Sequence, residues 1–192
     1  AVRGHLLRPD AETRHYRFFR AVNDGWLDCY VDDYDWQCAH MVGVFDDGVL
    51  RGIGEVIASA ADPADGQLGV SVETDFRQRG LGKMLLEAAL LRARTHGVRQ
   101  LTVSSLAGNT PLRALLAPYR TTSGFEGGVA ESTIALAAPD LRELLEEQGQ
   151  GNFALWHKGA IDLSDRIADG AALQHRLRET WQFMLGAGRQ GA

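Results

Sequence analysis

The clearest pattern of hydrophobic and polar positions in this chain runs from residue 67 to residue 73. Leu68, Val70 and Val72 alternate there with small or polar residues. Successive side chains of a β-strand point to opposite faces, so this alternation predicts a half-buried strand. The other face consists of Gln67, Gly69, Ser71 and Glu73. A face of small and polar side chains leaves room for a ligand, so this strand is the first candidate for a functional surface.

Other stretches of the chain are also typical of strands. Residues 41–45 and 49–58 are rich in β-forming residues, and Asp47-Gly48 between them favours the positive φ angles of a tight turn. These residues predict a β-hairpin. Residues 98–106 and 128–137 are further predicted strands.

Apolar residues recur at helical spacing in three other segments. We expect a helix over residues 10–25 with Asp10 as its N-cap, and a short helix over residues 108–119 with Asn109 near its start. Between them, a helix after residue 80 is predicted to end near Gly97. Its apolar stripe is formed by Leu81, Met84, Leu85, Ala88 and Leu91. The acidic and aromatic residues 28–36 are expected to form a solvated turn or to attract a cationic amine.

The order of these elements is helix, hairpin, strand, helix, strand, helix, strand. It predicts an α/β fold in which helices flank a mixed sheet. We expect this domain to cover residues 1–138 and a helical extension to cover residues 139–192, packed on the domain or on the partner in a homodimer. The apolar stripes of the extension are Leu141, Leu144 and Leu145, followed by Leu173, Leu177, Trp181 and Met184.

The composition of the chain indicates which classes of protein it can belong to. The 192 residues are 45% hydrophobic and 23% charged, the balance of a soluble globular protein. A formal net charge of -5 argues against broad attraction to nucleic acid, and no apolar run is long enough to span a membrane. Cys29 and Cys38 lack the spacing of a zinc site and are expected to be free thiols, with no metal bound. Without a signal peptide, the chain is expected to be cytoplasmic.

A turn rich in glycine and positive charge, RQRGLGK at residues 77–83, separates the alternating strand from the long helix. The first N–H groups of a helix have no intrahelical partner and carry the positive end of the helix dipole. Gly80 and Gly82 lack Cβ atoms, so an anion can approach the main chain there. The basic residues are Arg77, Arg79 and Lys83. The turn therefore predicts either a pyrophosphate site or an ordinary strand-to-helix connection, and it matches neither the P-loop nor the dinucleotide fingerprint.

In its context the turn resembles motif A of the GNAT N-acetyltransferase superfamily. That motif is Gln or Arg followed by x-x-Gly-x-Gly/Ala, with a hydrophobic residue five positions earlier; here these are Arg77, Gly80, Gly82 and Val72. The resemblance extends to GIGEVIA, LTVSSLAGNTPLRALL and TSGF, and RHYRFFRAV resembles the first helix of protein-acetyltransferase-like members. It implies the GNAT fold, a mostly antiparallel sheet splayed between the strands of residues 67–73 and 98–106.

The resemblance also implies acetyl-CoA as the cofactor. In such proteins the N–H groups of the turn bind the CoA pyrophosphate, and the preceding strand pairs its backbone with the pantetheine arm. Asn109 would contact the pantetheine or phosphate region, or would simply cap its helix. The cofactor-binding residues implied in this way are Val70, Val72, Arg77, Gln78, Arg79, Gly80, Leu81, Gly82, Lys83 and Asn109.

Acetyl transfer to an amine requires a neutral amine, a polarised thioester and a proton for the departing thiolate. Related acetyltransferases often place a glutamate where this chain has Gln67, and glutamine cannot act as a base at neutral pH. Glu55, in an apolar strand, is our candidate base or else the cross-strand partner of an arginine. Tyr119 is the candidate acid for the thiolate, or else a core tyrosine. Glu73 and Asp65 are expected to have structural roles.

The sequence thus predicts an acyl-CoA-dependent N-acyltransferase that acts by direct attack in a ternary complex. The expected acceptor is a small-molecule amine or a protein lysine, and neither nucleic acid nor a membrane is an expected partner. Because Gln67 replaces the usual carboxylate, an alternative stays open. It is a catalytically weak acyl-CoA-binding module with a regulatory or sensor role.

Overall fold

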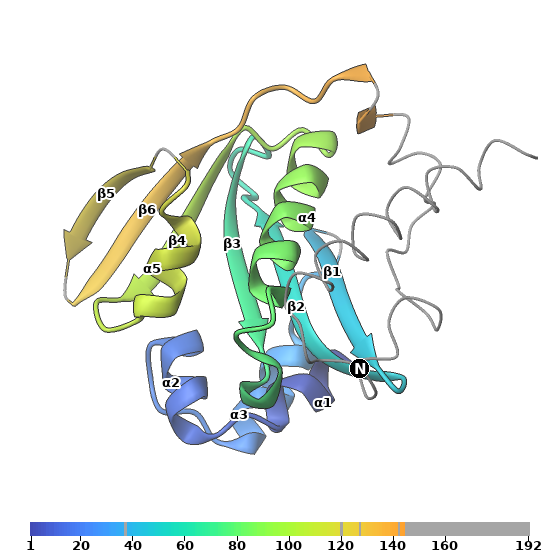
Figure 1. Cartoon of the computed structure of the whole chain (residues 1–192), viewed down its shortest axis with the longest axis vertical. Helices are drawn as coiled ribbons and strands as arrows, with labels where there is room; N and C mark the ends of the chain where they lie inside the picture. The colour runs from blue at the N-terminus through green and yellow to red at the C-terminus, as the bar shows by residue number, and fades with distance from the viewer. Residues whose placement is uncertain (37, 120, 127, 142, 145–192) are drawn as a thin grey trace, which may run out of the picture.

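The computed structural model describes residues 1–144 apart from 37, 120, 127 and 142, and shows a central sheet with helices on both faces (Figure 1). The helices are α1 (Val2–Leu7), α2 (Ala11–Phe18), α3 (Asp24–Asp32), α4 (Leu81–Thr95) and α5 (Thr110–Leu116), with the 3-10 turn η1 (Thr74–Phe76). The strands are β1 (Ala39–Asp46), β2 (Val49–Ala58), β3 (Asp65–Val72), β4 (Gln100–Leu106), β5 (Thr121–Glu126) and β6 (Val129–Ala135). The predicted α/β class is confirmed.

The sheet has the strand order β1-β2-β3-β4-β6-β5, and every neighbouring pair is antiparallel except β3 with β4. The predicted hairpin is β1–β2, and Asp47 and Gly48 adopt φ angles of 47° and 73° in its turn. Strand β5, which lies at the edge beyond β6, was not among the predicted strands. The sheet is therefore mixed and mostly antiparallel, as predicted.

The parallel strands β3 and β4 stay together over a short distance only. Asp65, Gly66 and Gln67 pair with Gln100, Leu101 and Thr102, and no further β3–β4 pair forms among the described residues. Beyond Gln67 the two strands diverge, and Figure 1 shows them separating toward the end where α4 begins. The predicted splay is present, and it leaves the edge of β3 from Leu68 onward without a strand partner on that side.

Helix α4 packs across β1, β2 and β3 and forms the main hydrophobic core with them. Its buried face is wider than the predicted stripe and comprises Leu81, Leu85, Leu86, Ala89, Leu90 and Ala93. The helix lies directly on the backbone of β2, because a Cβ at Gly54 would stand 2.8 Å from the carbonyl oxygen of Leu85. Gly97 ends the helix with a φ of 93°, as predicted.

The region before the sheet differs from the single helix predicted over residues 10–25. Asp10 caps α2 as expected, accepting a hydrogen bond from the Thr13 N–H at 2.7 Å, but α2 ends where Phe19 takes a left-handed φ of 58°. Asn23 then starts α3 by accepting from the Trp26 N–H at 2.8 Å. Much of the acidic and aromatic segment is therefore helical rather than a turn. These helices and α1 lie on the face of the sheet opposite α4.

The chain beyond β6 is described only as far as Leu144. Glu143 bonds Arg94 of α4, while the side chains of Leu141 and Leu144 are exposed. The stripes from Leu145 to Met184 lie outside the described residues, so the helical extension, the domain boundary and the homodimer stay predictions. In the described part of the chain, no helix combines the length and hydropathy that a membrane span needs.

Two histidine rings join the end of α4 to the start of β1. The rings of His40 and His96 lie 4.1 Å apart between centroids, and burial, followed by His96 and Arg92, lowers the pKa of His40 from 6.5 to about 4. The unfolded chain therefore binds a proton before the folded protein does, and stability is lost as the pH falls from 6.5 toward 4.

We expect His40→Gln to flatten this part of the stability curve, measured as the thermal midpoint against pH. The buried His5, whose pKa is also lowered by burial, contributes in the same direction and keeps part of the slope. Superimposable curves for the wild type and His40→Gln would show that His40 does not act in this way.

Candidate active site

The connection from β3 to α4 forms a concave turn of backbone N–H groups. It passes through η1, and then Gln78 and Gly80 take left-handed φ angles of 59° and 80°. Alternation of left- and right-handed residues turns successive N–H groups toward one side, which is typical of an anion-binding nest. Gly80 is the N-cap of α4, and no side chain caps the helix within the described structure. The amides of Leu81, Gly82 and Lys83 therefore lack intrahelical partners.

The two glycines of the turn are required for different reasons. Gly80 needs its conformation, because a φ of 80° strains any residue with a Cβ. Gly82 has no such φ, and a Cβ there would meet only the Leu115 side chain, at an ordinary distance of 3.8 Å. Glycine destabilises a helix by about 1 kcal/mol relative to alanine. The fold thus gives no reason for glycine at position 82, whereas a ligand that approaches the main chain does.

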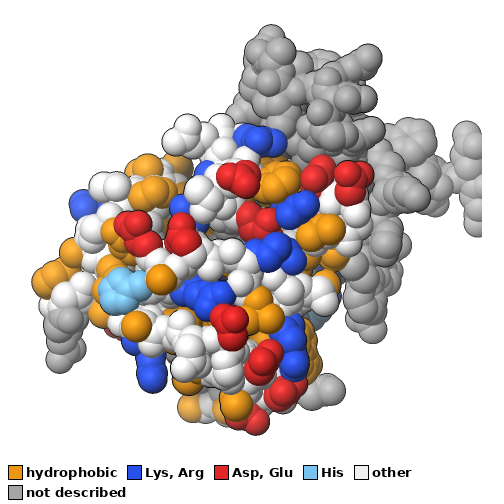
Figure 2. Space-filling view, turned by 90° about the horizontal axis from the view of Figure 1, so that it is seen from below, with side chains coloured by type: hydrophobic (Ala, Val, Ile, Leu, Met, Phe, Trp, Pro, Cys, Tyr) orange, Lys and Arg blue, Asp and Glu red, His pale blue; other side chains and the backbone are white. Residues whose placement is uncertain are grey.

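Most of the basic side chains of the turn make contacts that stabilise its conformation. The Arg77 guanidinium donates to the Val72 carbonyl at 3.0 Å and to the Thr13 hydroxyl of α2 at 3.1 Å. The Arg79 guanidinium lies 5.2 Å from the centre of the Phe76 ring, and Lys83 is exposed. Figure 2, seen from below, shows basic side chains beside acidic ones instead of one continuous basic surface. Attraction for an anion therefore arises locally, from the amides of the turn and these few cations.

The other residues predicted to bind a cofactor line the gap between β3 and β4. Val70 and Val72 direct their side chains to the core under α4, so their main chain forms the open edge. Asn109 is the N-cap of α5, and its side chain accepts from the Leu112 N–H at 3.2 Å. The capping role proposed for Asn109 is thus observed, and its contact with a cofactor stays a prediction.

Glu55 lies opposite Gly69 on the face of the sheet that α2 covers, and is 5% exposed. One carboxylate oxygen pairs with Arg17 of α2, and the other accepts from the Tyr34 hydroxyl at 3.0 Å. A Cβ at position 69 would stand 2.8 Å from Glu55 Oε1, so glycine there makes room for the pair. Glu55 thus has an arginine partner, but Arg17 comes from helix α2 and not from a neighbouring strand as predicted. Burial, and secondly Glu55, raise the pKa of Tyr34.

Glu73 is tied into a buried network with the N-terminal helices, in keeping with its expected structural role. Arg8 donates to it at 2.6 Å and Arg51 at 3.0 Å. Burial alone would raise the pKa of Glu73, but the two arginines outweigh burial and lower it. The fully buried His5 lies 3.1 Å from the Ser71 hydroxyl. Sequence reasoning missed Arg8 and His5, because no signal in α1 linked them to β3.

Gln67 lies at the start of the gap, and Tyr119 packs against the core formed under α4. Gln67 is exposed and belongs to the last β3–β4 pair, with Thr102, where the splay begins. Tyr119 follows α5 and packs against the core, and burial, with a smaller effect of Glu87, raises its pKa. Asp65 donates its N–H to the Asp62 carbonyl in the preceding turn, in keeping with the expected turn role.

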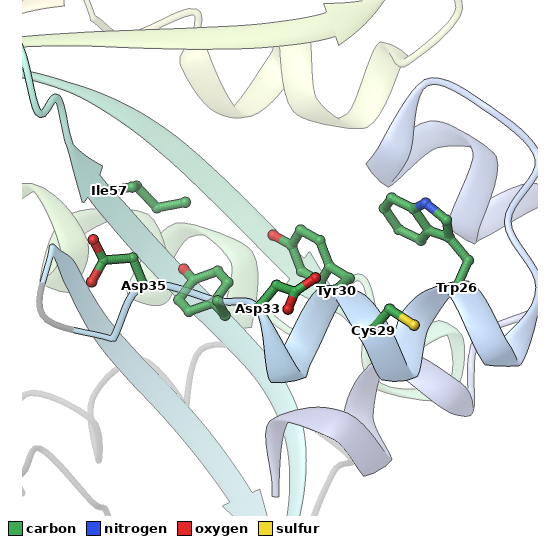
Figure 3. Close-up of a pocket in the computed structure, with 7 residues that line it drawn as sticks. Trp26, Cys29, Tyr30, Asp33, Asp35 and Ile57 are labelled. Carbon is green, nitrogen blue, oxygen red and sulfur yellow. The ribbon is translucent and has the colours of Figure 1, made fainter.

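The acidic and aromatic segment encloses a pocket of about 380 Å³ that the sequence did not predict as a cavity. Figure 3 shows Trp26 and Tyr30 projecting from α3 toward the side on which Ile57 of β2 lies. Asp33, Tyr34 and Asp35 complete the lining together with Cys29. The signal in the sequence is the spacing of Trp26 and Tyr30, one helical turn apart, which places two rings on one face of α3, with Tyr34 just beyond the end of the helix.

An open strand edge that leads to an uncapped, glycine-lined helix start defines a site for an extended ligand with an anionic end. Within the described residues, no group of three or more His, Cys, Asp or Glu side chains is placed to hold a metal ion. The sequence pattern of the Acetyltransferase (GNAT) family matches residues 8–117. The chain belongs to this family, as the resemblance of the turn predicted.

Individual relatives agree with this assignment. An acetyltransferase of Pseudomonas aeruginosa is 29% identical over 118 residues, which are 59% of this chain and 63% of that protein. The GNAT domain of S. lividans PAT has a TM-score of 0.59 at 19% identity, over 70% of this chain and 83% of that one. The PaiA N-acetyltransferase from Thermoplasma acidophilum, in complex with coenzyme A, has a TM-score of 0.52 at 13% identity, over 69% and 92%. At these identities the two structures establish the fold.

Proposed function

We propose that this protein transfers an acetyl group from acetyl-CoA to a primary amine by direct attack in a ternary complex. The observation that carries the proposal is the continuous path from the unpaired edge of β3 to the uncapped start of α4. Pantetheine is an extended amide chain, so it suits a strand edge, and a pyrophosphate suits unpartnered N–H groups. The coenzyme A complex of the PaiA N-acetyltransferase supports the same ligand for this fold.

Different residues along this path bind different parts of the coenzyme. The main chain of Val70 and Val72 pairs with pantetheine, and the amides from Gln78 to Lys83 hold the pyrophosphate. The cations of Arg79 and Lys83 stand beside the phosphates, while Arg77 keeps the turn in place through Val72 and Thr13. Asn109 orients the start of α5 on the far side of the gap.

The acceptor approaches from the face of the sheet that carries Glu55. One oxygen of Glu55 is held by Arg17, so a proton reaches this carboxylate through the Tyr34 hydroxyl, 3.0 Å from the other oxygen. We assign Glu55 and Tyr34 to the removal of the amine proton. The neutral amine then attacks the thioester carbon, the C–S bond breaks, and Tyr119 on the other face protonates the thiolate. The proton that the nitrogen loses as it becomes an amide restores the Tyr119 hydroxyl. A tyrosine with its ordinary pKa of about 10 is protonated at neutral pH, and burial raises the pKa of Tyr119 further.

A second function is favoured by one observation. Gln67 occupies the start of the splay where a carboxylate would serve as base, and Glu55 is already paired with an arginine. A protein with this arrangement binds acyl-CoA and turns it over slowly, which suits a sensor or regulatory module.

Release of the CoA thiol in the presence of a panel of amines, peptides with lysine, and amino acids tests the enzyme. We expect turnover with at least one amine and a loss of about a hundredfold in kcat for Tyr119→Phe and for Tyr34→Phe, the usual scale of general acid–base catalysis. Tight binding of CoA without turnover of any acceptor would favour the sensor. Absence of CoA binding at low salt would contradict both.

A further inference from the structure

The pocket beside α3 offers an aromatic surface to a ligand. The rings of Trp26 and Tyr30 stack 5.4 Å apart at 19°, and the Tyr34 ring stands edge-on to Tyr30 at 5.7 Å. The Arg20 guanidinium already lies 5.4 Å from the centre of the Trp26 ring. Aromatic faces attract cations, and the Trp26 ring already has one beside it within the molecule. Ile57 adds an apolar wall from β2.

The same pocket carries the negative charge of Asp33. The other acidic residues of α3 are paired, Asp24 with Arg14, and Asp28 and Asp32 with Arg3. Among the described residues no ion pair forms at Asp33, which lines the pocket. Asp35, on the same rim, raises the pKa of the Cys38 thiol, mainly through a hydrogen bond. Rings, an unpaired carboxylate and an apolar wall together select an organic cation.

The pocket lies close to the start of the gap. Ile57 pairs with Gln67, and Gln67 pairs with Thr102 where β3 and β4 begin to diverge. Neighbouring strands are about 4.8 Å apart, so one strand spacing separates the pocket wall from β3. Tyr34 lines the pocket and also bonds Glu55. A ligand in the pocket therefore extends past Tyr34 toward the thioester.

A cation that Asp33 holds stays protonated and cannot attack a thioester, so the reacting nitrogen must be a different one. We infer that the pocket binds a second positive charge on the acceptor, and that the preferred substrates are amines carrying another cationic group on an apolar chain. This inference rests on the proposed transfer to an amine. Another pocket, lined by Phe19, Ser104, Val129 and Glu131, has a single ring and suits a cation less well.

Putrescine and butylamine form a matched pair of acceptors that differ in the second amine only. We expect the kcat/KM of the wild type to be at least tenfold higher for putrescine. Asp33→Asn should reduce this preference about tenfold, mainly through the KM for putrescine, and Trp26→Leu should reduce it as well. Asp47→Asn in the distant hairpin turn removes the same charge and should leave the preference unchanged. Equal kcat/KM values for the two amines, or a preference that survives both pocket variants, would overturn the inference.

Calorimetry separates this inference from the proposed function. Putrescine is titrated into protein saturated with CoA, in which no transfer occurs. Binding that is lost in Asp33→Asn and retained in Asp47→Asn supports the pocket even if no amine is ever acetylated. An absence of putrescine binding contradicts the pocket even if butylamine is acetylated.

Discussion

Replacement of Gly82 by alanine is expected to stabilise the protein and to weaken its binding of CoA. The position is helical, a Cβ there meets only an ordinary contact, and alanine favours a helix by about 1 kcal/mol. The same methyl group covers the amides on which the pyrophosphate would rest. A hydrogen bond to a charged group is worth about 1.5–3 kcal/mol, so the loss of one lowers the affinity roughly ten- to hundredfold.

Thermal unfolding and CoA titration of Gly82→Ala and Gly82→Val check both directions. Valine should abolish measurable binding and still give a folded protein, since the backbone at this position is allowed and the nearest neighbour of its Cβ is the flexible Leu115 side chain, at 3.8 Å. Gly80→Ala is the matched control, because its positive φ makes it strained and less stable. Unchanged affinity per folded molecule in both Gly82 variants would show that the ligand does not approach this backbone.

Substitution of Arg17 by leucine is expected to cost about 3–5 kcal/mol of unfolding free energy. The change leaves Glu55 as a buried carboxylate without its cation, and an unpaired buried charge is among the most destabilising changes a protein can receive. Arg3→Leu is the control. Its partners Asp28 and Asp32 are exposed, so this loss should stay below about 1 kcal/mol.

Denaturant unfolding of the double variant completes the test. Arg17→Leu with Glu55→Gln removes both charges and keeps an acceptor for Tyr34, so it should be more stable than Arg17→Leu alone. If Arg17→Leu is no more destabilising than Arg3→Leu, the pair does not hold α2 on the sheet. Helix α2 also carries Thr13, the partner of Arg77 in the turn. Such a result would therefore show that the acceptor side and the turn are not linked through the position of α2.

The sheet was predictable from local patterns, and the N-terminal helices were not. The alternating pattern, the Asp47-Gly48 turn and Gly97 at the helix end predicted β1 to β4 and α4, because each of these signals acts within a few residues. The division between α2 and α3 depends on the left-handed Phe19 and on the Asn23 cap. Both residues can be found in the sequence, but the apolar residues at helical spacing across residues 10–25 favoured one continuous helix. Strand β5 is defined by pairing with β6, a contact that no local pattern contains.

The candidate site shows the same division. The nest of the turn is formed by Gln78 and Gly80, which lie two residues apart in the sequence, so motif and geometry agree at Gly80. The acceptor side is assembled from residues far apart in the chain, and Arg17, Tyr34 and Glu55 meet only in three dimensions. The sequence therefore identified Glu55 as a candidate without revealing which groups hold its two oxygens.

The contact between Gly54 and the backbone of α4 sets the height at which this helix lies above the sheet. Any side chain at that position lifts the helix and tilts its first turn away from the end of β3. In a screen that scores loss of coenzyme binding, substitutions in the middle of β2 are therefore expected to be as damaging as substitutions in the turn. A map of sensitive positions in this protein will thus extend well beyond the residues that touch a ligand.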